Sequence, residues 1–423
     1  MLTLKVITEN QDEVVRRLAK KHFPAKEATD RIITLDAIRR TSQAELEANQ
    51  SEVNRVSKEI GILMKEGKKT EAEEAKAKVA VLKEKNKELD TAKSDAEAAI
   101  HELSVTIPNL PHDSVPEGRS PEDNLCERSG GILPEIPDNH LPHWDLAKKY
   151  DLIDFETGVK ITGAGFPVYK GKGARLQRAL INFFLDNACK AGYTEIQTPY
   201  LVNAESGFGT GNLPDKEGQM YHATVDDLYL IPTSEVSVTN IYRNMILDEK
   251  ELPLMNTAYS ACFRREAGSY GKDVRGLNRL HQFDKVEIVR IDTPDHSYQS
   301  LMEMVDYVQS LLEMLELPWR ILRLCGGDMS FASALTFDFE VFSAAQKRWL
   351  EVSSVSNFES FQANRLKCRY RDENRKIQLC HTLNGSALAL PRIVAALLEN
   401  NQTPEGIRIP KALVPYTGFE LIP

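Results

Sequence analysis

The sequence predicts a protein of the α+β class with an antiparallel two-helix coiled coil near its N-terminus. Apolar residues follow a heptad spacing over residues 29–103, prolines crowd residues 105–145, and residues 146–423 alternate amphipathic helical segments with short strand-like ones. A chain of 423 residues has room for two or three domains. We therefore expect an N-terminal helical domain over 1–104, a proline-rich linker over 105–145 and a larger α+β domain over 146–423.

The composition, with 42% apolar and 27% charged residues, is that of an ordinary globular protein. We find no apolar run of the roughly 18 residues that a membrane span needs, and the N-terminal MLTLKVITEN does not resemble a signal peptide. The six cysteines form no CxxC pair, which favours reduced thiols over a zinc site or a disulfide framework. These features predict a cytoplasmic protein without a membrane partner.

The net charge of −9 argues weakly against nucleic-acid binding, which depends on clustered lysine and arginine. Acidic and basic residues are nearly balanced over 1–103, so the excess of acid lies in the rest of the chain. An N-terminal arm can therefore still present a basic stripe.

Residues 29–103 show the spacing of two helices that pack along one seam. The seam positions form two rows in each half: Ile32, Leu46, Val53 and Ile60 with Leu35, Val56 and Leu63, then Ala72, Val79 and Ile100 with Ala75, Leu82, Leu89, Ala96 and Leu103. Polar residues interrupt these rows, a device that fixes register at a cost in stability: Arg39, Ser42, Asn49, Asn86 and Lys93. Gly67 is predicted to end the first helix, and Thr70 with Glu73 is predicted to form a capping box for the second. A dimerisation or spacer coil would show the same heptads, but a hairpin that has buried its own seam makes a stiff projecting arm.

The segments on either side of this hairpin are less regular. Residues 1–8 alternate apolar and polar side chains and predict a short strand or extended piece, followed by a helix over 11–21. The prolines between 105 and 145 are predicted to exclude regular helix and sheet, which places a domain boundary there.

The C-terminal part is predicted to form one α+β domain. Leu176, Leu180 and Phe184 predict an amphipathic helix over 172–192. The further predicted elements are strands at 193–202 and 228–231, a helix at 236–246, strands at 258–264 and 282–290, a helix at 295–317, strands at 349–355 and 379–383, and a helix after Ser386 with Pro391 early in it. Gly207, Gly209 and Gly211 have the spacing of a dinucleotide fingerprint, but no strand–helix context supports that reading, so we expect a mobile loop.

The stretch from Phe263 to Glu287, FRREAGSYGKDVRGLNRLHQFDKVE, combines arginines, acidic residues and glycines between two predicted strands. Arginine suits the binding of phosphate or carboxylate because its planar fork donates two hydrogen bonds and keeps its charge. Glycines let a connecting loop take left-handed turns and approach a ligand closely: Gly268, Gly271 and Gly276. An ordinary hairpin with a solvated loop is the alternative for such a segment.

This stretch resembles motif 2 of the class II aminoacyl-tRNA synthetases, specifically that of the seryl-tRNA synthetase family. The helix and strand over 172–202 resemble motif 1, which forms the dimer interface in that class, and HTLNGSALALPRIVAALLEN resembles motif 3. The segments TSE at 233–235 and EVSS at 351–354 also match the family, and the resemblance runs in order along the whole chain. It implies an antiparallel-sheet catalytic core that carries a coiled-coil arm.

The resemblance also implies a reaction and its substrates. L-serine and ATP would give seryl-adenylate, and the seryl group would pass to tRNA(Ser), with tRNA(Sec) as a further expected acceptor. A homodimer is expected, together with Mg²⁺, which prefers hard oxygen ligands. The arm would reach across the dimer to the long variable arm of the tRNA. Candidate phosphate contacts are the basic residues Arg39, Arg40, Arg55, Lys58, Lys76, Lys78, Lys83 and Lys85.

The residue roles follow from the same resemblance. Arg264 would contact the α-phosphate and the attacking carboxylate, Arg279 and Arg392 the outer phosphates, Glu266 the adenine amino group and Phe283 the adenine ring. Catalysis is expected to rest on Arg264, Glu351 and Arg392. The full ATP set is Arg264, Arg265, Glu266, Arg279, Phe283, Glu351, Val352, Ser353, Ser354 and Arg392. The serine set is Thr233, Ser234, Glu235, Arg264, Glu287, Asn384 and Ser386, and the metal ligands are Glu351 and Ser354.

Simpler explanations remain open for some of these residues. Thr233 or Ser234 can serve only as a helix N-cap, and Glu351 can face solvent. Two other functions also deserve weight: a class II synthetase-like ligase that loads an amino acid onto a carrier protein, and a non-catalytic coiled-coil protein with a decayed core. The heptad hairpin argues against the first, and the joint presence of the arginines and glutamates argues against the second.

Overall fold

The computed structural model describes residues 1–135, 140–215, 217–266 and 275–423. By their contacts these residues form two compact units. The first comprises Met1–Ala19 and Phe23–Pro108, and the second comprises Lys20–His22 and Asn109–Pro423. Over the described residues, no helix combines the length and the apolar character needed to cross a bilayer.

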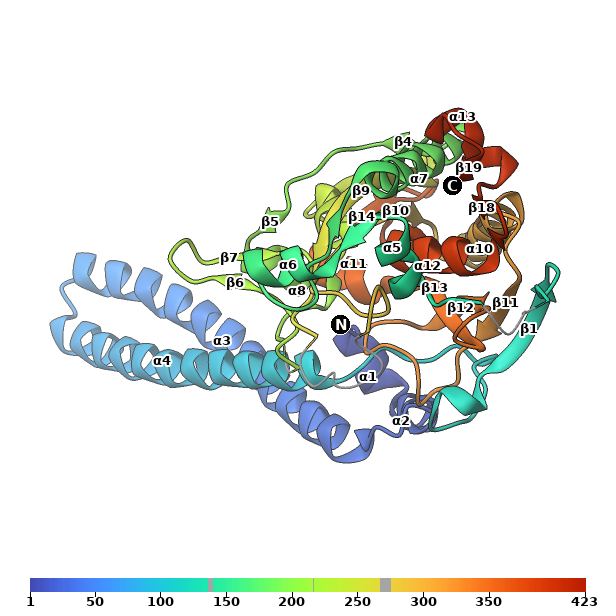
Figure 1. Cartoon of the computed structure of the whole chain (residues 1–423). Coiled ribbons are helices and arrows are strands. Elements are labelled where there is room, and N and C mark those ends of the chain that lie inside the picture. Colours follow the sequence, from blue (N-terminus) through green and yellow to red (C-terminus); the bar gives the residue numbers. More distant parts are fainter. Residues whose placement is uncertain (136–139, 216, 267–274) are drawn as a thin grey trace. The chain divides into compact units, whose positions relative to one another are not determined.

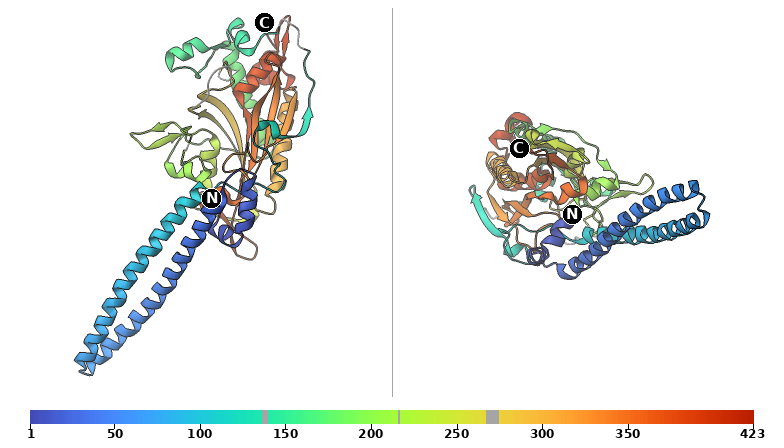
Figure 2. Two further views of the ribbon diagram at one scale, coloured as in Figure 1. Left: turned by 90° about the horizontal axis from the view of Figure 1, so that it is seen from below. Right: turned by 180° about the vertical axis from the view of Figure 1, so that it is seen from behind.

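The first unit is entirely helical. Its elements are α1 (Leu4–Glu9), α2 (Gln11–Ala19), α3 (Ala25–Lys65) and α4 (Lys69–Thr106). The two long helices run antiparallel, side by side along their length (Figure 2). Seam positions predicted from the heptads, including Ile32, Leu35, Val53 and Val56, are buried. The predicted helical hairpin is therefore present, and its helices extend beyond the expected range.

The start of the chain differs from the prediction. Residues expected to be extended form the short helix α1, because the Thr3 hydroxyl caps it by accepting a hydrogen bond from the Val6 N–H group. Helical geometry buries Ile7 completely. An alternation of only eight residues could not distinguish this one-sided helix from a strand.

At the turn of the hairpin, the predicted end of the first helix is correct, whereas the predicted cap of the second helix is wrong. Gly67 takes a left-handed φ of 78°, and the Lys68 N–H group donates to the Leu63 carbonyl at 3.0 Å, which closes the end of α3. The helix α4 begins at Lys69 after an N-cap residue whose side chain makes no capping bond. The expected capping box of Thr70 and Glu73 is wrong, because Thr70 already lies inside the helix.

Charged and polar side chains also join the two long helices. Glu52 of α3 accepts from Lys78 of α4 at 2.6 Å, and Lys85 of α4 lies 3.1 Å from Glu45 of α3. Within the seam, the buried atoms Asn49 Nδ2 and Asn86 Oδ1 have no hydrogen-bond partner among the described residues. The seam therefore contains two buried polar atoms that form no hydrogen bond with each other or with another described residue.

The second unit is built on an eight-stranded sheet, and every neighbouring pair in it is antiparallel except β4 with β9. In spatial order its strands are β1 (Leu125–Gly130), β11 (Trp319–Arg323), β12 (Leu335–Ser343), β13 (Arg348–Asn357), β16 (His381–Ala389), β10 (Gln282–Asp292), β9 (Leu254–Phe263) and β4 (Thr194–Glu195). The antiparallel sheet expected from the resemblance is confirmed.

Helices and smaller sheets surround this sheet (Figure 1). The helices are α5 (His143–Lys149), α6 (Phe155–Ile161), α7 (Gly171–Lys190), α8 (Ala204–Thr210), α9 (Ser234–Thr239), α10 (Ser297–Met314), α11 (Ser360–Leu366), α12 (Leu390–Asn400) and α13 (Val414–Thr417). One small sheet comprises β5 (Leu201–Val202), β7 (Leu228–Leu230) and β6 (His222–Ala223), and a second comprises β15 (Ile377–Leu379), β14 (Arg369–Arg371) and β8 (Ile246–Asp248). A third comprises β17 (Gln402–Thr403), β18 (Gly406–Arg408) and β19 (Leu421–Ile422). The strands β2 (Ile153–Asp154) and β3 (Val168–Tyr169) form a two-stranded sheet.

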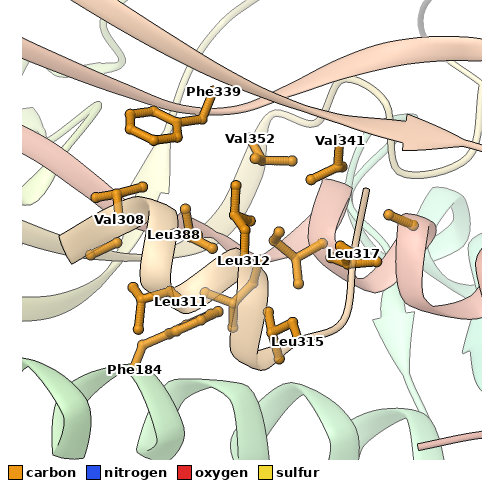
Figure 3. Close-up of a cluster of buried hydrophobic side chains, with 14 of the residues drawn as sticks. Phe184, Val308, Leu311, Leu312, Leu315, Leu317, Phe339, Val341, Val352 and Leu388 are labelled. Atoms are coloured by element: carbon orange, nitrogen blue, oxygen red, sulfur yellow. The ribbon is translucent and has the colours of Figure 1, made fainter. Parts of the chain in front are cut away.

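The core lies between one face of the large sheet and the helices that cover it. Figure 3 shows α10 held between the sheet and α7, with its leucines directed at both. The buried side chains of this cluster include Phe184, Val308, Leu311, Leu312, Leu315, Phe339, Val341, Val352 and Leu388. Replacing one such leucine with alanine costs about 2–5 kcal/mol. The covered face is therefore rigid, and the opposite side of the central strands is left for polar side chains.

Several predicted elements need correction. Residues 121–130, expected to be irregular, form a short 3₁₀ turn and the strand β1, because the prolines flank that strand rather than interrupt it. The glycine-rich segment at 207–211 lies largely in α8 and is not a loop; a Cβ atom on Gly209 would lie 2.5 Å from Leu366 Cδ2. The helix expected at 236–246 ends at Thr239, and β16 runs through Asn384 to Ala389. Residues 193–202 contribute two short strands to two different sheets.

Candidate active site

The alternation of β10 sorts its side chains onto two faces. Val286 and Ile288 point into the core, whereas Phe283, Lys285 and Glu287 lie on the other face. The neighbouring strands add to this polar face, because Glu287 pairs directly with Ser386 of β16 and Lys285 with Ser260 of β9. The predicted motif 2 and motif 3 residues therefore meet at the centre of the sheet.

A pocket of about 190 Å³ opens beside these residues. Most of the predicted ATP-binding residues line it: Arg264, Glu266, Arg279, Phe283, Glu351, Val352, Ser353 and Arg392. Ser386, which is expected to bind serine, and Lys285 line it as well. Side chains from β10, β13, β16, α12 and the segment that follows β9 are thus gathered around one cavity.

The three pocket arginines are held in different ways. The Arg264 guanidinium lies 5.2 Å from the centre of the Phe283 ring, and its Nε donates to the Pro232 carbonyl at 3.3 Å. Arg392 donates to the carbonyls of Asn278 at 3.1 Å and Glu351 at 2.6 Å, from the first turn of α12. These backbone contacts hold both guanidinium groups at the pocket wall.

Arg279 is paired with the carboxylate predicted to bind adenine. Its Nη1 donates to Glu266 Oε2 at 2.9 Å. Glu266 has a φ of 48°, in the left-handed region that a glutamate rarely adopts. In this state the two residues therefore satisfy each other, and ATP contacts as predicted would require them to separate.

Glu351 and Ser354 share one face of the sheet because of a β-bulge. Residues three apart on a regular strand point to opposite faces. Here Glu351 pairs with Glu340 and Ser353 pairs with Phe339, so Val352 is an extra residue in the ladder. The bulge brings Ser354 opposite Asp338 and turns it toward the same polar chamber that Glu351 lines.

The oxygen atoms around this bulge suit a divalent cation. Burial, followed by the charge of Glu351, raises the pKa of Asp338 well above its usual value, although a hydrogen bond from Ser354 opposes the shift. The buried Asp338 Oδ1 atom has no hydrogen-bond partner among the described residues. An unpaired buried carboxylate oxygen next to a carboxylate and a hydroxyl makes a hard donor set of the kind that Mg²⁺ binds. The predicted ligands Glu351 and Ser354 therefore fit this ion.

The predicted serine-binding residues form a buried network around Glu287, which is 1% exposed. Asn384 donates to its Oε1 at 2.9 Å, and Thr233 donates to its Oε2 at 3.2 Å. Lys285 forms an ion pair with Oε2 and donates to the Thr233 hydroxyl at 2.9 Å. Burial raises the pKa of Glu287, and Lys285 is the largest opposing influence.

Glu235 is a second buried carboxyl group in this region. Gln362 donates to its Oε1 at 2.7 Å. Burial, with a further contribution from the charge of Glu287, raises the pKa of Glu235 to about 7. Thr233 is the N-cap residue of α9 and accepts from the Glu235 N–H group at 3.3 Å. The capping role that was the alternative for Thr233 or Ser234 is therefore present at Thr233, and it coexists with the contact to Glu287.

Several predicted residues do not line the pocket itself, among them Thr233, Glu235, Glu287 and Asn384 of the buried network and Ser354 of the neighbouring chamber. The Arg265 side chain is exposed and does not line the cavity. Ser234 is fully buried and its hydroxyl is hydrogen-bonded to that of Ser260 at 2.6 Å. The glycines Gly268 and Gly271 lie outside the described residues. Gly276 has a φ of 66°, and a Cβ atom there would lie 2.2 Å from His143 Nε2.

Lys285, Asn278 and Asp338 belong to the site but were not predicted. Lys285 could have been found from its place between Phe283 and Glu287, since alternate residues of a strand share a face. Asp338 has no such signal, because its neighbours become clear only from the pairing of β12 with β13. Asn278 contributes a backbone carbonyl, which no sequence pattern reveals.

The comparisons with known proteins agree with this geometry. The seryl-tRNA synthetase N-terminal domain family matches residues 1–111, and the tRNA synthetase class II core domain family (G, H, P, S and T) matches residues 220–401. A serine–tRNA ligase of Salinibacter ruber is 52% identical, with 100% of this chain and 99% of that protein covered. The match to the N-terminal family disfavours the carrier-protein ligase.

Two solved structures are similar over the whole chain. The seryl-tRNA synthetase of Pyrococcus horikoshii, complexed with ATP, has a TM-score of 0.93 at 33% identity and covers 100% of this chain and 99% of its own. The cytoplasmic serine–tRNA ligase of Naegleria fowleri, in complex with AMP, has a TM-score of 0.90 at 26% identity, with 100% and 98% covered. With its pocket, its sheet and its helical hairpin, the chain belongs to the seryl-tRNA synthetase family.

Proposed function

We propose that this chain, an ATP-dependent serine–tRNA ligase, activates serine in the pocket lined by β10, β13, β16 and α12 and then transfers it to tRNA. The observation that carries the proposal is that one cavity is lined both by the arginines expected to hold a triphosphate and by Lys285, which forms an ion pair with the buried Glu287. In the first step the serine carboxylate attacks the α-phosphorus of ATP and pyrophosphate leaves. No protein nucleophile is needed, so catalysis consists of positioning and of charge stabilisation.

The nucleotide is held by the arginines and by one aromatic ring. Arg264 contacts the Phe283 ring and its charge acts on Glu287, so it can contact the α-phosphate and the serine carboxylate together. Arg392 faces the cavity from α12 and would hold an outer phosphate, and Arg279 would do the same after leaving Glu266. Phe283 stacks on adenine, and Glu266 accepts a hydrogen bond from the adenine amino group.

Glu351 and Ser354 would hold Mg²⁺, supported by the bulge that places them on one face. The ion would offset the negative charge of the phosphates. Asp338 lies beside both ligands and restrains Ser354 through their hydrogen bond.

Serine selection rests on hydrogen bonding to its hydroxyl group. Glu287 would accept a hydrogen bond from the hydroxyl group, Glu235 would contact the amino group, and Asn384 and Ser386 would complete the subsite. A site built to pair a hydroxyl group rejects alanine, because the buried acceptor is then left without a partner.

For the second step we propose that the arm of α3 and α4 binds the backbone of tRNA(Ser), with tRNA(Sec) as a further acceptor. The exposed basic residues of the hairpin support this proposal. The two chains of a homodimer would associate through α7 and the strands that follow it, and the protein would work in the cytoplasm, where tRNA is charged. In this division of labour residues 1–104 recognise tRNA, 105–145 connect and 146–423 catalyse.

The test separates the two steps. Wild-type protein should catalyse serine-dependent ATP–pyrophosphate exchange and should charge tRNA(Ser). A variant in which residues 40–96 are replaced by a short turn should retain exchange within about threefold and lose charging by at least about 100-fold, since it keeps the pocket and lacks the arm. Equal loss of both activities in a folded variant would contradict the division, and absence of serine-dependent exchange in the wild type would refute the function.

A further inference from the structure

We propose that Lys285 is a positioning residue that sets the preference of the site for serine over amino acids without a hydroxyl group. The inference rests on the proposed serine subsite and adds to it a residue that the resemblance did not assign. Lys285 is 4% exposed, and its ammonium group reaches both Glu287 and Thr233.

The contacts of Lys285 restrict how Glu287 can bind a ligand. An ionised carboxylate has about four acceptor positions. Asn384 occupies one on Oε1, and Thr233 and Lys285 occupy two on Oε2. One acceptor position, on Oε1, therefore remains for the substrate hydroxyl. Lys285 also donates to the Thr233 hydroxyl, which leaves the Thr233 proton directed at Glu287 and fixes the orientation of the network.

Charge is the second part of the argument. Without Lys285, the neutral donors Thr233 and Asn384 would be the remaining hydrogen-bonding partners of Glu287. The charge of Arg264 favours the anion less strongly than Lys285 does, and the nearby carboxyl group of Glu235 opposes it. A carboxylate buried with neutral partners takes up a proton, because burial disfavours the charged form. A protonated Glu287 would offer a hydrogen where the site needs an acceptor. Lys285 thus keeps Glu287 as the anion that receives the serine hydroxyl.

Loss of the Lys285 ammonium group should consequently raise the KM for serine more than the KM for ATP. The nucleotide is held by Arg264, Arg392 and Phe283, none of which has a hydrogen bond or ion pair with Lys285 among the described residues. The acceptor for the serine hydroxyl, in contrast, depends on Lys285 directly. Alanine has no hydroxyl group that could hydrogen-bond to Glu287, so the slow activation of alanine should change little.

The experiment measures ATP–pyrophosphate exchange by the full-length protein with serine and with alanine, for wild type, K285M, K285Q and K285R. For K285M the KM for serine should rise by at least about 30-fold, the KM for ATP should stay within about threefold, and the serine-to-alanine ratio of kcat/KM should fall by at least about tenfold. K285R keeps the charge and should lie closest to wild type. K376M, which removes an exposed lysine of the same unit, is the matched control and should behave as wild type.

The pH profile gives a readout that a merely structural role would not change. The acidic limb of kcat/KM for serine should move to higher pH by about one unit in K285M and K285Q, and should stay in place in K285R. If K285M does not fold, K285Q and K285R carry the comparison.

Two results would overturn the proposal. One is a common loss of kcat with both amino acids at an unchanged serine-to-alanine ratio, and the other is an unshifted acidic limb in both uncharged variants. Either result, with a wild type that exchanges in the presence of serine, would leave the proposed function intact. A wild type inactive with serine would instead contradict the function itself.

Discussion

His143 Nδ1 lies 2.8 Å from Glu399 Oε1, and neither side chain is exposed to solvent. The other ring nitrogen, Nε2, accepts a hydrogen bond from the Leu277 N–H group at 2.8 Å. Nε2 is therefore unprotonated and Nδ1 carries the hydrogen, so the ring is the neutral tautomer. Ser343 also donates to Glu399. This buried group connects α5 and α12 with the segment at 277–279 that lines the proposed nucleotide pocket.

From this relationship we predict that H143A destabilises the protein and weakens ATP binding. Glu399 would lose a buried partner and Leu277 its acceptor, at a cost of about 2–4 kcal/mol. The KM for ATP should rise more than that for serine, because the displaced segment faces the nucleotide. Urea unfolding and exchange kinetics measure both effects, with the half-exposed His222 replaced by alanine as the control. Unchanged stability would show that the group does not hold this segment.

The pKa of Glu235 leads to a pH-dependent prediction. Because burial raises that pKa to about 7, folding favours the protonated form. This contribution to stability is present at low pH and is lost as pH rises from the ordinary glutamate pKa toward 7 and above. E235Q stays neutral and avoids the loss, so its free energy of unfolding relative to wild type should increase by about 1–3 kcal/mol between pH 5 and pH 8.

Urea unfolding without serine at several pH values tests this prediction. The variant E205Q removes an exposed carboxylate of the same unit and should run parallel to wild type. If the curves for E235Q and wild type are also parallel, Glu235 has an ordinary pKa.

A third prediction concerns Glu351 and the bulge next to it. E351Q should raise the Mg²⁺ concentration needed for half-maximal exchange by at least about tenfold, and S354A should have a smaller effect in the same direction. Electron paramagnetic resonance of Mn²⁺ with ATP and enzyme measures the binding directly. E313Q, on the exposed side of α10, should change neither quantity. Equal Mn²⁺ affinity in all variants would place the metal site elsewhere.

The fourth prediction concerns the polar seam of the arm. Asn49 Nδ2 and Asn86 Oδ1 are buried without partners among the described residues, and the nearby Lys85–Glu45 pair places this part of α4 beside α3. The double variant N49L/N86L should stabilise the hairpin by about 1–3 kcal/mol, because two unsatisfied polar groups leave the interior.

Amide hydrogen exchange of α3 and α4 measures the change in the arm alone. N54L introduces the same side chain at an exposed position of α3 and should not change the rate of amide hydrogen exchange. Faster exchange in the double variant would mean that the two amides hold the helices in register.

The sequence was informative wherever a repeat extended over many residues. The heptads located α3 and α4, and helical spacing located α7 and α10 to within a few residues. Short elements were harder: α1 depends on a cap by Thr3, and β1 is a strand because of its partner β11, which lies almost 200 residues further along the chain. No local pattern contains that information.

In the candidate site, too, residues in local motifs could be predicted, whereas residues placed by the pairing of distant strands could not. Residues inside recognisable motifs, such as Arg264, Glu287 and Arg392, were placed near the pocket from the sequence. The shared face of Glu351 and Ser354 depends on an extra residue in a ladder, and Asp338 joins them through the neighbouring strand. Arg265 follows Arg264 in sequence, but the end of β9 leaves its side chain exposed.

The pairing of β16 with β10 has a consequence for how the protein is made. Residues from Arg264 to Arg392 must all be present before the cavity is complete, because its lining residues span this whole range of the chain. The hairpin, in contrast, is held by contacts between neighbouring stretches of chain, which form quickly during synthesis. A chain that ends before residue 392 therefore contains every residue of the hairpin but lacks part of the wall of the cavity.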